Sequence, residues 1–389
     1  MILGYEEEKW KKLGGEFTAR EIMQQPEVWL KTYELVKALE PQIKAFHTQY
    51  IQEGSRIIFA GAGSSDYIGT IISHTIGKKL KAQVMAVATT DIVSNPEDCI
   101  DRDQKTVLVS FARSGNSPES VGAFRLLQKH LKDIRHVVIT CNKDGNLAQI
   151  ARKDKDNFVL VLPEETNDIG FAMTSSFSSM LLAALLFFDI RHIDQNKTYV
   201  EAISREGKLI LDTRWKQVKA LLTENVERVI YLGSGCLRGL AKELALKNME
   251  LTNGAIPAMH ESILGFRHGP KTFMNNHALV LVLASTDPYV NQYEKDLIDE
   301  MVRDSGSHKL AVFRGNQADY HEPQCVQLTV ETEAVPEAYM LFGYLLYGQI
   351  LALFNSVRMG VTPDNPCPGG SVNRVVKGVI LYDECYTGR

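Results

Sequence analysis

The sequence lacks clustered cysteines, an excess of basic charge and a long apolar run. Its six cysteines lie far apart, at Cys99, Cys141, Cys236, Cys325, Cys367 and Cys385. Because none forms a CxxC pair, we expect reduced thiols rather than disulfides or a cysteine metal site. The formal net charge of −4 gives no sign of a nucleic-acid or membrane surface. The chain starts without the basic residues of a signal peptide, and its most apolar run, residues 180–190, is too short to span a bilayer, so we expect a soluble cytoplasmic protein.

Two patterns typical of cofactor sites are also incomplete. The stretch GAGSSD at residues 61–66 begins like a dinucleotide-binding fingerprint, but Asp66 stands where the third glycine belongs. His260, Glu261 and His268 do not reproduce HExxH or another zinc spacing. We therefore expect no nicotinamide, no metal and no other cofactor.

Short apolar runs that suit β-strands alternate with helical stretches along the chain. The first five occur at residues 56–60, 84–88, 106–110, 136–140 and 158–162. Five more follow in the same order after an offset of about 170 residues, at residues 228–232, 256–260, 278–284, 309–314 and 326–330. The alternation predicts an α/β fold with parallel sheets between layers of helices, and the offset predicts an internal duplication.

We divide the chain accordingly into four parts. Residues 1–45 form a helical segment, in which residues 23–39 have helical periodicity and end just before Pro41. Residues 46–200 form the first repeat and residues 201–345 the second. Residues 346–389 complete a helix predicted over residues 335–357 and continue as an irregular tail rich in proline and glycine.

The stretch SFARSGNSPES, residues 110–120, follows the third strand of the first repeat and leads into a predicted helix over residues 117–131. Ser117 suits the N-cap, and Pro118 suits the first helical position. Free N–H groups at such a helix start, together with the hydroxyls of Ser114 and Ser117, favour binding of a phosphate. The alternative is an ordinary helix cap with solvated serines. The second repeat has residues 285–288 at this point, without Ser-Gly-x-Ser, so we expect only the first repeat to keep the cradle.

Three further positions suit catalysis or sugar binding. Ser65 follows the first strand in a hydroxyl-lined turn and could bond a sugar hydroxyl. Glu250 lies near the apolar stripe of a predicted helix, where burial tends to raise a carboxyl pKa and so suits proton transfer; the alternative is a surface glutamate paired with Lys247 or Arg267. His268 lies in a tight loop between glycines and a proline and is a candidate acid–base group; the alternative is a hydrogen-bonded loop histidine.

Four stretches together resemble the sugar isomerase (SIS) domain, present twice, and most closely its AgaS type, described as a galactosamine-6-phosphate deaminase/isomerase. They are SFARSGNSPES, ETNDIGFAMTSSFSSM (165–180), HESILGFRHGP (260–270) and TPDNPCPGGSVNRVV (362–376). The resemblance covers nearly the whole chain after residue 45. It implies two tandem SIS domains, each a flavodoxin-like three-layer α/β/α unit.

The isomerase domain of glucosamine-6-phosphate synthase is a more distant resemblance, and it implies roles for individual residues. Its phosphate loop falls on Ala112, Arg113, Ser114 and Ser117, with Ala112 in place of a serine and Arg113 in place of a glutamine. Its sugar-binding serine falls on Ser65, its catalytic glutamate on Glu250, its ring-opening histidine on His268 and its C-terminal lysine on Lys377. In that family the histidine reaches into the site of a dimer partner. Ser64, Asn116 and Thr174 complete the expected substrate-binding set.

The resemblance implies an enzyme that acts on a 2-amino-2-deoxyhexose 6-phosphate, with galactosamine 6-phosphate as the expected substrate. The products would be tagatose 6-phosphate and ammonium. The chain shows no glutamine-hydrolysing domain, which favours breakdown of amino sugars over synthesis. A homodimer or higher homo-oligomer with a shared site is implied. Two alternatives stay open: an aldose–ketose isomerase of neutral sugar phosphates, and a phosphosugar-sensing module without catalysis. Residue spacing does not distinguish a galacto from a gluco substrate.

Overall fold

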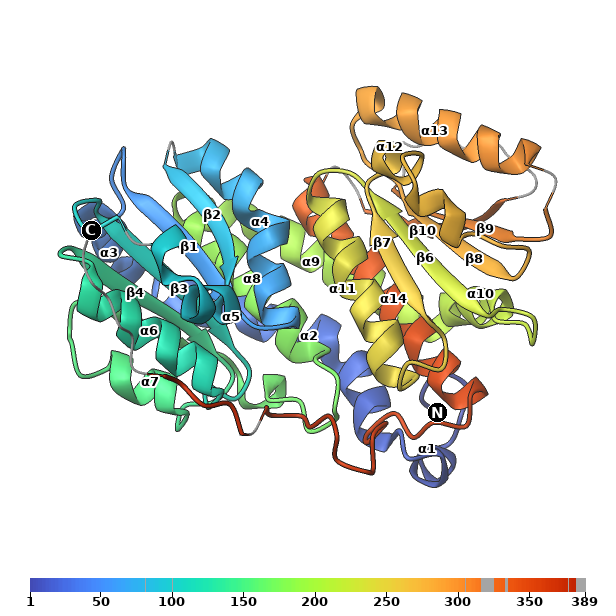
Figure 1. The fold of residues 1–389 in the computed structure, drawn as a ribbon, viewed down its shortest axis with the longest axis horizontal. Coiled ribbons are helices and arrows are strands. Elements are labelled where there is room, and N and C mark those ends of the chain that lie inside the picture. The colour runs from blue at the N-terminus through green and yellow to red at the C-terminus, as the bar shows by residue number, and fades with distance from the viewer. Residues whose placement is uncertain are drawn as a thin grey trace.

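The chain folds into two parallel β-sheets, each flanked by helices (Figure 1). The computed structural model describes residues 1–80, 82–99, 101–304, 306–315, 325–332, 335–376 and 378–382. The first sheet contains β1 (Arg56–Gly61), β2 (Gln83–Ala88), β3 (Thr106–Ala112), β4 (Ile134–Thr140) and β5 (Phe158–Val161). The second contains β6 (Arg228–Gly233), β7 (Ala258–Glu261), β8 (Ala278–Leu283), β9 (Lys309–Gly315) and β10 (Cys325–Val330).

The topology confirms the α/β class and the internal duplication. The strand orders are β2-β1-β3-β4-β5 and β10-β9-β8-β6-β7, so the second sheet, read from its other edge, repeats the first. Neighbouring strands pair in parallel in both sheets. This order reverses direction beside the first strand of each sheet, and ligands of such folds bind at the carboxyl ends of the strands near that point.

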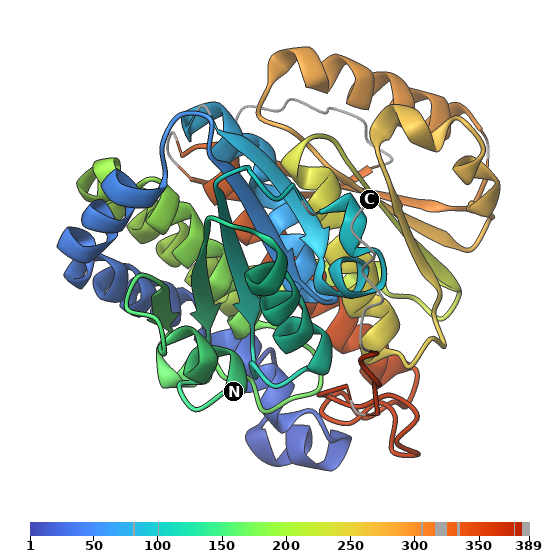
Figure 2. The same cartoon turned by 60° about the vertical axis from the view of Figure 1, so that its left-hand side comes forward.

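Helices cover both faces of the first sheet, as Figure 2 shows. One face packs on α4 (Ser64–Leu80) and α8 (Ser175–Phe188), and the other on α6 (Pro118–His130). The remaining helices of this part are α5 (Thr89–Ser94) and α7 (Asn146–Ala151). The second part contains α11 (Cys236–Leu251), α12 (Ile263–Phe266), α13 (Pro288–Arg303) and α14 (Glu337–Arg358). Short helical turns occur at η1 (Pro96–Asp98), η2 (Glu164–Thr166), η3 (Ile190–His192), η4 (Ile210–Arg214) and η5 (Pro270–Phe273).

The N-terminal segment is helical, as predicted, and forms α1 (Glu7–Leu13), α2 (Glu16–Ala38) and α3 (Glu40–Tyr50). Helix α2 starts seven residues before the predicted start and passes through Pro26, so proline did not stop it. Helices α9 (Ile193–Leu209) and α10 (Trp215–Leu221) link the two parts, and α9 runs through the division we placed after residue 200.

The two parts meet where α4 packs against α11 (Figure 1). Gly239 permits this close approach, because a Cβ added there would lie 2.8 Å from Ile71 Cγ1 and 3.0 Å from the Ile71 backbone nitrogen. On its other side α11 packs against α14. The contact brings the start of α4, with its serines, next to the helix that carries Glu250.

Helix α14 forms part of the core. It is the one helix among the described residues that is long and apolar enough to cross a membrane, and 94% of its apolar window is buried inside the protein. The five described cysteines are free thiols, as predicted, while Cys385 lies outside the described residues. After α14 the tail turns back and runs along the first part of the molecule (Figure 1).

Candidate active site

The serine loop is held in a fixed shape at the carboxyl end of β3. Gly115 has a φ of +67°, a conformation that glycine adopts without strain. The carbonyl of Ser114 accepts a hydrogen bond from Asn142 Nδ2 (2.9 Å), and Asn116 Oδ1 accepts one from the Asn146 N–H (3.0 Å). The loop after β4 therefore positions the loop after β3.

The start of α6 agrees with the sequence prediction in position but not in its capping bond. Ser117 occupies the N-cap and Pro118 the first helical position. The Ser117 hydroxyl, however, hydrogen-bonds to Ser120 Oγ (2.7 Å) and makes no capping bond to a backbone N–H. The predicted N-cap position of Ser117 is confirmed, but its hydroxyl donates to Ser120 Oγ instead of accepting from a backbone N–H. Backbone N–H groups in the first turn of a helix lack acceptors within that helix, and such groups are able to bind an anion.

The matching position of the second part is filled by a carboxylate of the protein itself. Glu337, the first residue of α14, accepts hydrogen bonds from Ser285 Oγ (2.5 Å) and from the Thr286 N–H (2.7 Å). The Cys236 thiol lies 3.2 Å from the same carboxylate. The loop of the second repeat is therefore occupied by a carboxylate of the protein itself, and an open cradle in the first repeat stays a prediction.

Helix α11 presents two carboxylates and one ammonium group on one face. Lys247 is fully buried between Glu243, 3.5 Å away, and Glu250, with which it forms a close ion pair. Burial raises the pKa of Glu243 to about 8. Burial alone would lower the pKa of Lys247, but the two carboxylates raise it. Both oxygens of the Glu243 carboxyl group are buried and have no hydrogen-bond partner among the described residues.

Sequence reasoning missed Glu243, although the spacing of residues 243, 247 and 250 places them on one face of a helix. In the sequence analysis, pairing of Glu250 with Lys247 belonged to the alternative interpretation, in which Glu250 is a surface residue. Here the lysine is buried, and the Glu250 side chain is 25% exposed. The other possible partner, Arg267, pairs with Glu300 instead.

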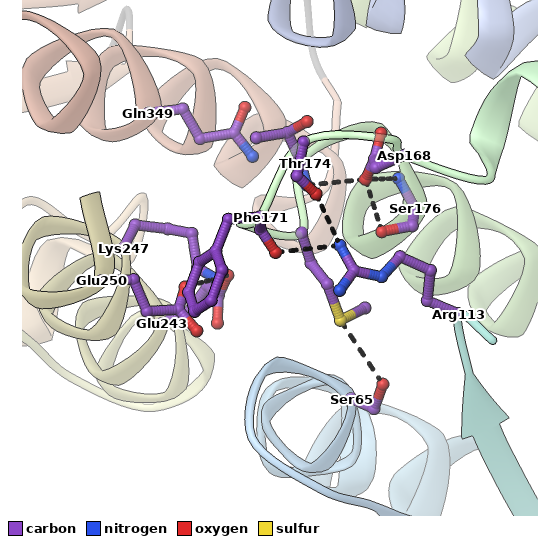
Figure 3. A network of polar contacts seen from close by, with 12 residues as sticks. Ser65, Arg113, Asp168, Phe171, Thr174, Ser176, Glu243, Lys247, Glu250 and Gln349 are labelled. Carbon is purple, nitrogen blue, oxygen red and sulfur yellow. Dashed lines mark hydrogen bonds and ion pairs between the residues drawn. The ribbon is translucent and has the colours of Figure 1, made fainter. Parts of the chain in front are cut away.

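The segment before α8 closes the site from a third side (Figure 3). The buried Asp168 carboxylate accepts hydrogen bonds from the backbone N–H groups of Thr174 and Ser176, both at 2.8 Å, and so caps the start of α8. Arg113 Nη1 donates to the carbonyls of Gly170 (3.2 Å) and Phe171 (3.1 Å). Sequence reasoning did not single out Asp168.

Charges from both parts of the molecule meet at Arg113. Burial, together with the charge of Arg374, lowers its pKa, while Asp168 and Glu250 act in the opposite direction. Glu250 from the second part and Arg113 from the first therefore lie within electrostatic range of each other. Figure 3 shows the α11 cluster, Arg113, Thr174 and Ser65 converging from separate elements. The residue directly after β3 and the charged cluster on α11 thus come close to each other between the two sheets.

The chain is similar to SIS-domain proteins along nearly its whole length. A family model of the SIS domain matches residues 49–190. The D-galactosamine-6-phosphate deaminase AgaS of Shewanella sp. (strain ANA-3) is 39% identical, and the match covers 96% of this chain and 94% of the relative. The chain belongs to the AgaS family.

Solved structures agree with this membership in the AgaS family. A proposed tagatose-6-phosphate ketose/aldose isomerase from Clostridium novyi NT matches with a TM-score of 0.94 and 39% identity, over 99% of each chain. The tagatose-6-phosphate ketose/aldose isomerase from Escherichia coli matches with a TM-score of 0.86 and 34% identity, over 95% of this chain and 97% of that one.

Within this AgaS-family structure, Ser64, Ser65 and Thr174 lie at the meeting point of the elements. Both serines are buried in the first turn of α4, and Ser65 Oγ contacts Met173 Sδ at 3.8 Å. Thr174 occupies the N-cap of α8, where its buried hydroxyl has no hydrogen-bond partner in the part of the chain that the structure describes. A buried hydroxyl without a partner is suited to a ligand contact.

Two predicted residues of the AgaS-type site are not joined to this cluster. His268 lies in the turn after α12, and its exposed side chain makes no hydrogen bond or ion pair with any described residue. Its acid–base role, like the alternative of a hydrogen-bonded loop histidine, stays a prediction. Lys377 lies outside the described residues.

Proposed function

We propose that this protein is an isomerising deaminase that converts D-galactosamine 6-phosphate to tagatose 6-phosphate and ammonium. The carrying observation is the α11 cluster of Glu243, Lys247 and Glu250 beside an anion cradle, in a chain 39% identical to a relative named D-galactosamine-6-phosphate deaminase. An anion cradle alone would serve a sensing protein equally well. A buried acid–base cluster is suited to proton transfer.

The substrate phosphate binds in the cradle formed by Ser114, Asn116 and Ser117. The hydroxyls and the free N–H groups at the start of α6 donate to its oxygens, and the helix dipole favours its charge. Ser64, Ser65 and Thr174 face the sugar. Arg113 uses three of its N–H donors on backbone carbonyls, so we assign it to holding the site together as well as to attracting the phosphate.

Glu250 transfers the proton of the isomerisation. After the pyranose ring opens, Glu250 takes the proton from C2 of the aldehyde and the resulting enolamine is reprotonated at C1. The product is an imine at C2, and addition of water to it releases ammonium and leaves the ketose 6-phosphate. Lys247 holds the Glu250 carboxylate in place through their ion pair, and Glu243 lies next to the Lys247 ammonium group on the same helix face. No electrons are exchanged with a cofactor in this sequence.

Ring opening requires a second acid–base group, and we assign it to His268 from a second copy of the chain. Its exposed position away from the cluster is consistent with a site completed by a partner in a homodimer or larger homo-oligomer. The tail that leads to Lys377 closes over the sugar. We place the protein in the cytoplasm, where its free thiols would stay reduced.

Ammonium release is the decisive measurement. Purified protein is offered galactosamine 6-phosphate, glucosamine 6-phosphate and neutral hexose 6-phosphates, with ammonium and ketose measured separately. Ammonium from the galacto compound is the expected result, and the gluco compound tests selectivity at C4. Ketose from a neutral sugar without ammonium from either amine would support the second candidate, an aldose–ketose isomerase, which the name of the Escherichia coli structure favours.

A further inference from the structure

Helix α2 of the N-terminal segment reaches the site through one buried carboxylate. The Glu21 side chain accepts hydrogen bonds from the backbone N–H groups of Ile169 and Gly170, the latter at 3.1 Å. Glu21 is only 6% exposed. It is separated from these partners by nearly 150 residues, so the contact joins the start of the chain to the segment before α8.

The same short segment is held from its opposite side by Arg113. Glu21 binds its N–H groups, whereas Arg113 binds the carbonyls of Gly170 and Phe171. The fit at Gly170 is close, because an added Cβ would lie 2.8 Å from both Glu21 Oε2 and Thr18 Oγ1. Residues 169–171 are thus fixed between α2 and the end of β3, directly before the serine loop.

The C-terminal tail is fastened to the same two places. Asp364 accepts hydrogen bonds at the start of α2, from the Thr18 N–H and from Thr18 Oγ1, both at 2.7 Å. Ten residues later, Arg374 Nε donates to the Asp168 carbonyl (2.9 Å). The Arg374 carbonyl in turn accepts from Arg113 Nη2 (2.9 Å). Arg374 is only three residues before Lys377.

We propose that Glu21 is a positioning residue of the active site, which holds residues 169–171 and, through Arg113 and Arg374, the tail that leads to Lys377. The proposal rests on the proposed function for its kinetic consequences. Glu21 does not reach the substrate. Its role is to keep the segment before α8 and the tail in one arrangement while the sugar is bound, and misplacement of such supporting groups lowers turnover more than ground-state binding.

Glutamine is a conservative replacement for Glu21, because the surroundings of Glu21 favour an uncharged side chain. Burial, with Asp168 and Asp364 nearby, raises the pKa of Glu21 to about 8. Burial and the two neighbouring carboxylates therefore favour the neutral form of Glu21. Glutamine is neutral, has nearly the same shape and keeps a carbonyl oxygen for the two N–H groups. Alanine removes that acceptor.

The test compares Glu21→Ala with Glu21→Gln, and uses Glu27→Ala on the exposed side of α2 as the matched control. The readouts are kcat and KM for ammonium release, the Kd for inorganic phosphate by calorimetry, and hydrogen exchange of peptides spanning 165–174 and 364–376. We expect Glu21→Ala to lower kcat by about 10- to 100-fold, with little change in phosphate Kd and faster exchange in both peptides. Glu21→Gln and Glu27→Ala should behave like the natural protein.

Three results would overturn the proposal: wild-type kcat in Glu21→Ala, unchanged exchange in both peptides, or a Glu21→Gln variant as impaired as Glu21→Ala. If Glu21→Ala does not fold, Arg374→Met removes the exposed end of the same chain of contacts and should give the same loss of kcat with unchanged phosphate Kd. If the natural protein releases no ammonium, the proposed function fails, and the exchange measurements still decide whether Glu21 holds the segment and the tail.

Discussion

Replacing Gly239 with alanine should push apart the two helices on which the site is built. The new Cβ would lie 2.8 Å from Ile71 Cγ1 and 3.0 Å and 3.1 Å from the backbone N and Cα of the same residue. A side chain can rotate away from such a contact, but the backbone of α4 cannot. The start of α4, with Ser64 and Ser65, would therefore shift relative to Glu250 on α11.

The expected size follows from two opposing contributions. Replacing a helical glycine by alanine stabilises a helix by about 1 kcal/mol, while overpacking a tight contact costs about 1–3 kcal/mol. The net loss for Gly239→Ala is therefore about 0–2 kcal/mol. Gly77, within α4, provides the matched control because an added Cβ would meet Val84 only at 3.6 Å, an ordinary contact. Gly77→Ala should gain about 0.5–1 kcal/mol.

Thermal unfolding and ammonium release measure the two effects together. We expect Gly239→Ala to melt below Gly77→Ala by several degrees and to lose turnover, while Gly77→Ala melts slightly above the natural protein and keeps its kcat. Equal melting temperatures for the two variants, with full activity in both, would refute the argument that the α4–α11 contact sets the geometry of the site.

Three further predictions concern single carboxylates. Glu250→Gln should lower ammonium release by about 10²–10⁴-fold and leave the Kd for phosphate unchanged; normal turnover would remove Glu250 from the mechanism. The pKa of Glu243 is about 8 in the folded state and about 4.5 in the unfolded state. Between pH 4.5 and pH 8 the natural protein should therefore lose about 1.4 kcal/mol of folding stability for each pH unit of increase. Glu243→Gln should not show this loss. An equal change in melting temperature between pH 5.5 and pH 7.5 for the natural protein and for Glu243→Gln would contradict this. Glu337→Ala leaves the donors of Ser285 and Thr286 without their acceptor and should lower the free energy of unfolding by about 1–3 kcal/mol. Millimolar phosphate should then raise the melting temperature of this variant more than that of the natural protein. An equal rise in both proteins would show that the loop of the second repeat does not bind anions.

The sequence by itself determined the features that depend on local pattern. Alternating apolar runs marked all ten strands to within about two residues, because buried parallel strands are short and almost continuously apolar. The offset between the two sets predicted the repeated topology. The start of α6 after the glycine-containing loop at residues 114–117 was also predictable, since helix starts are determined by neighbouring residues.

Tertiary structure alone decided how buried polar groups are paired. Nothing near Glu21 in the sequence points to Gly170, and nothing near Glu337 points to Ser285, because these partners meet only when the sheets and helices pack. Packing likewise distinguishes Glu243 from Glu250, two residues of one type on one helix face, because it buries the first completely and leaves the second partly exposed. A pKa depends on the dielectric and charges around a group, and these are set by packing rather than by sequence neighbours.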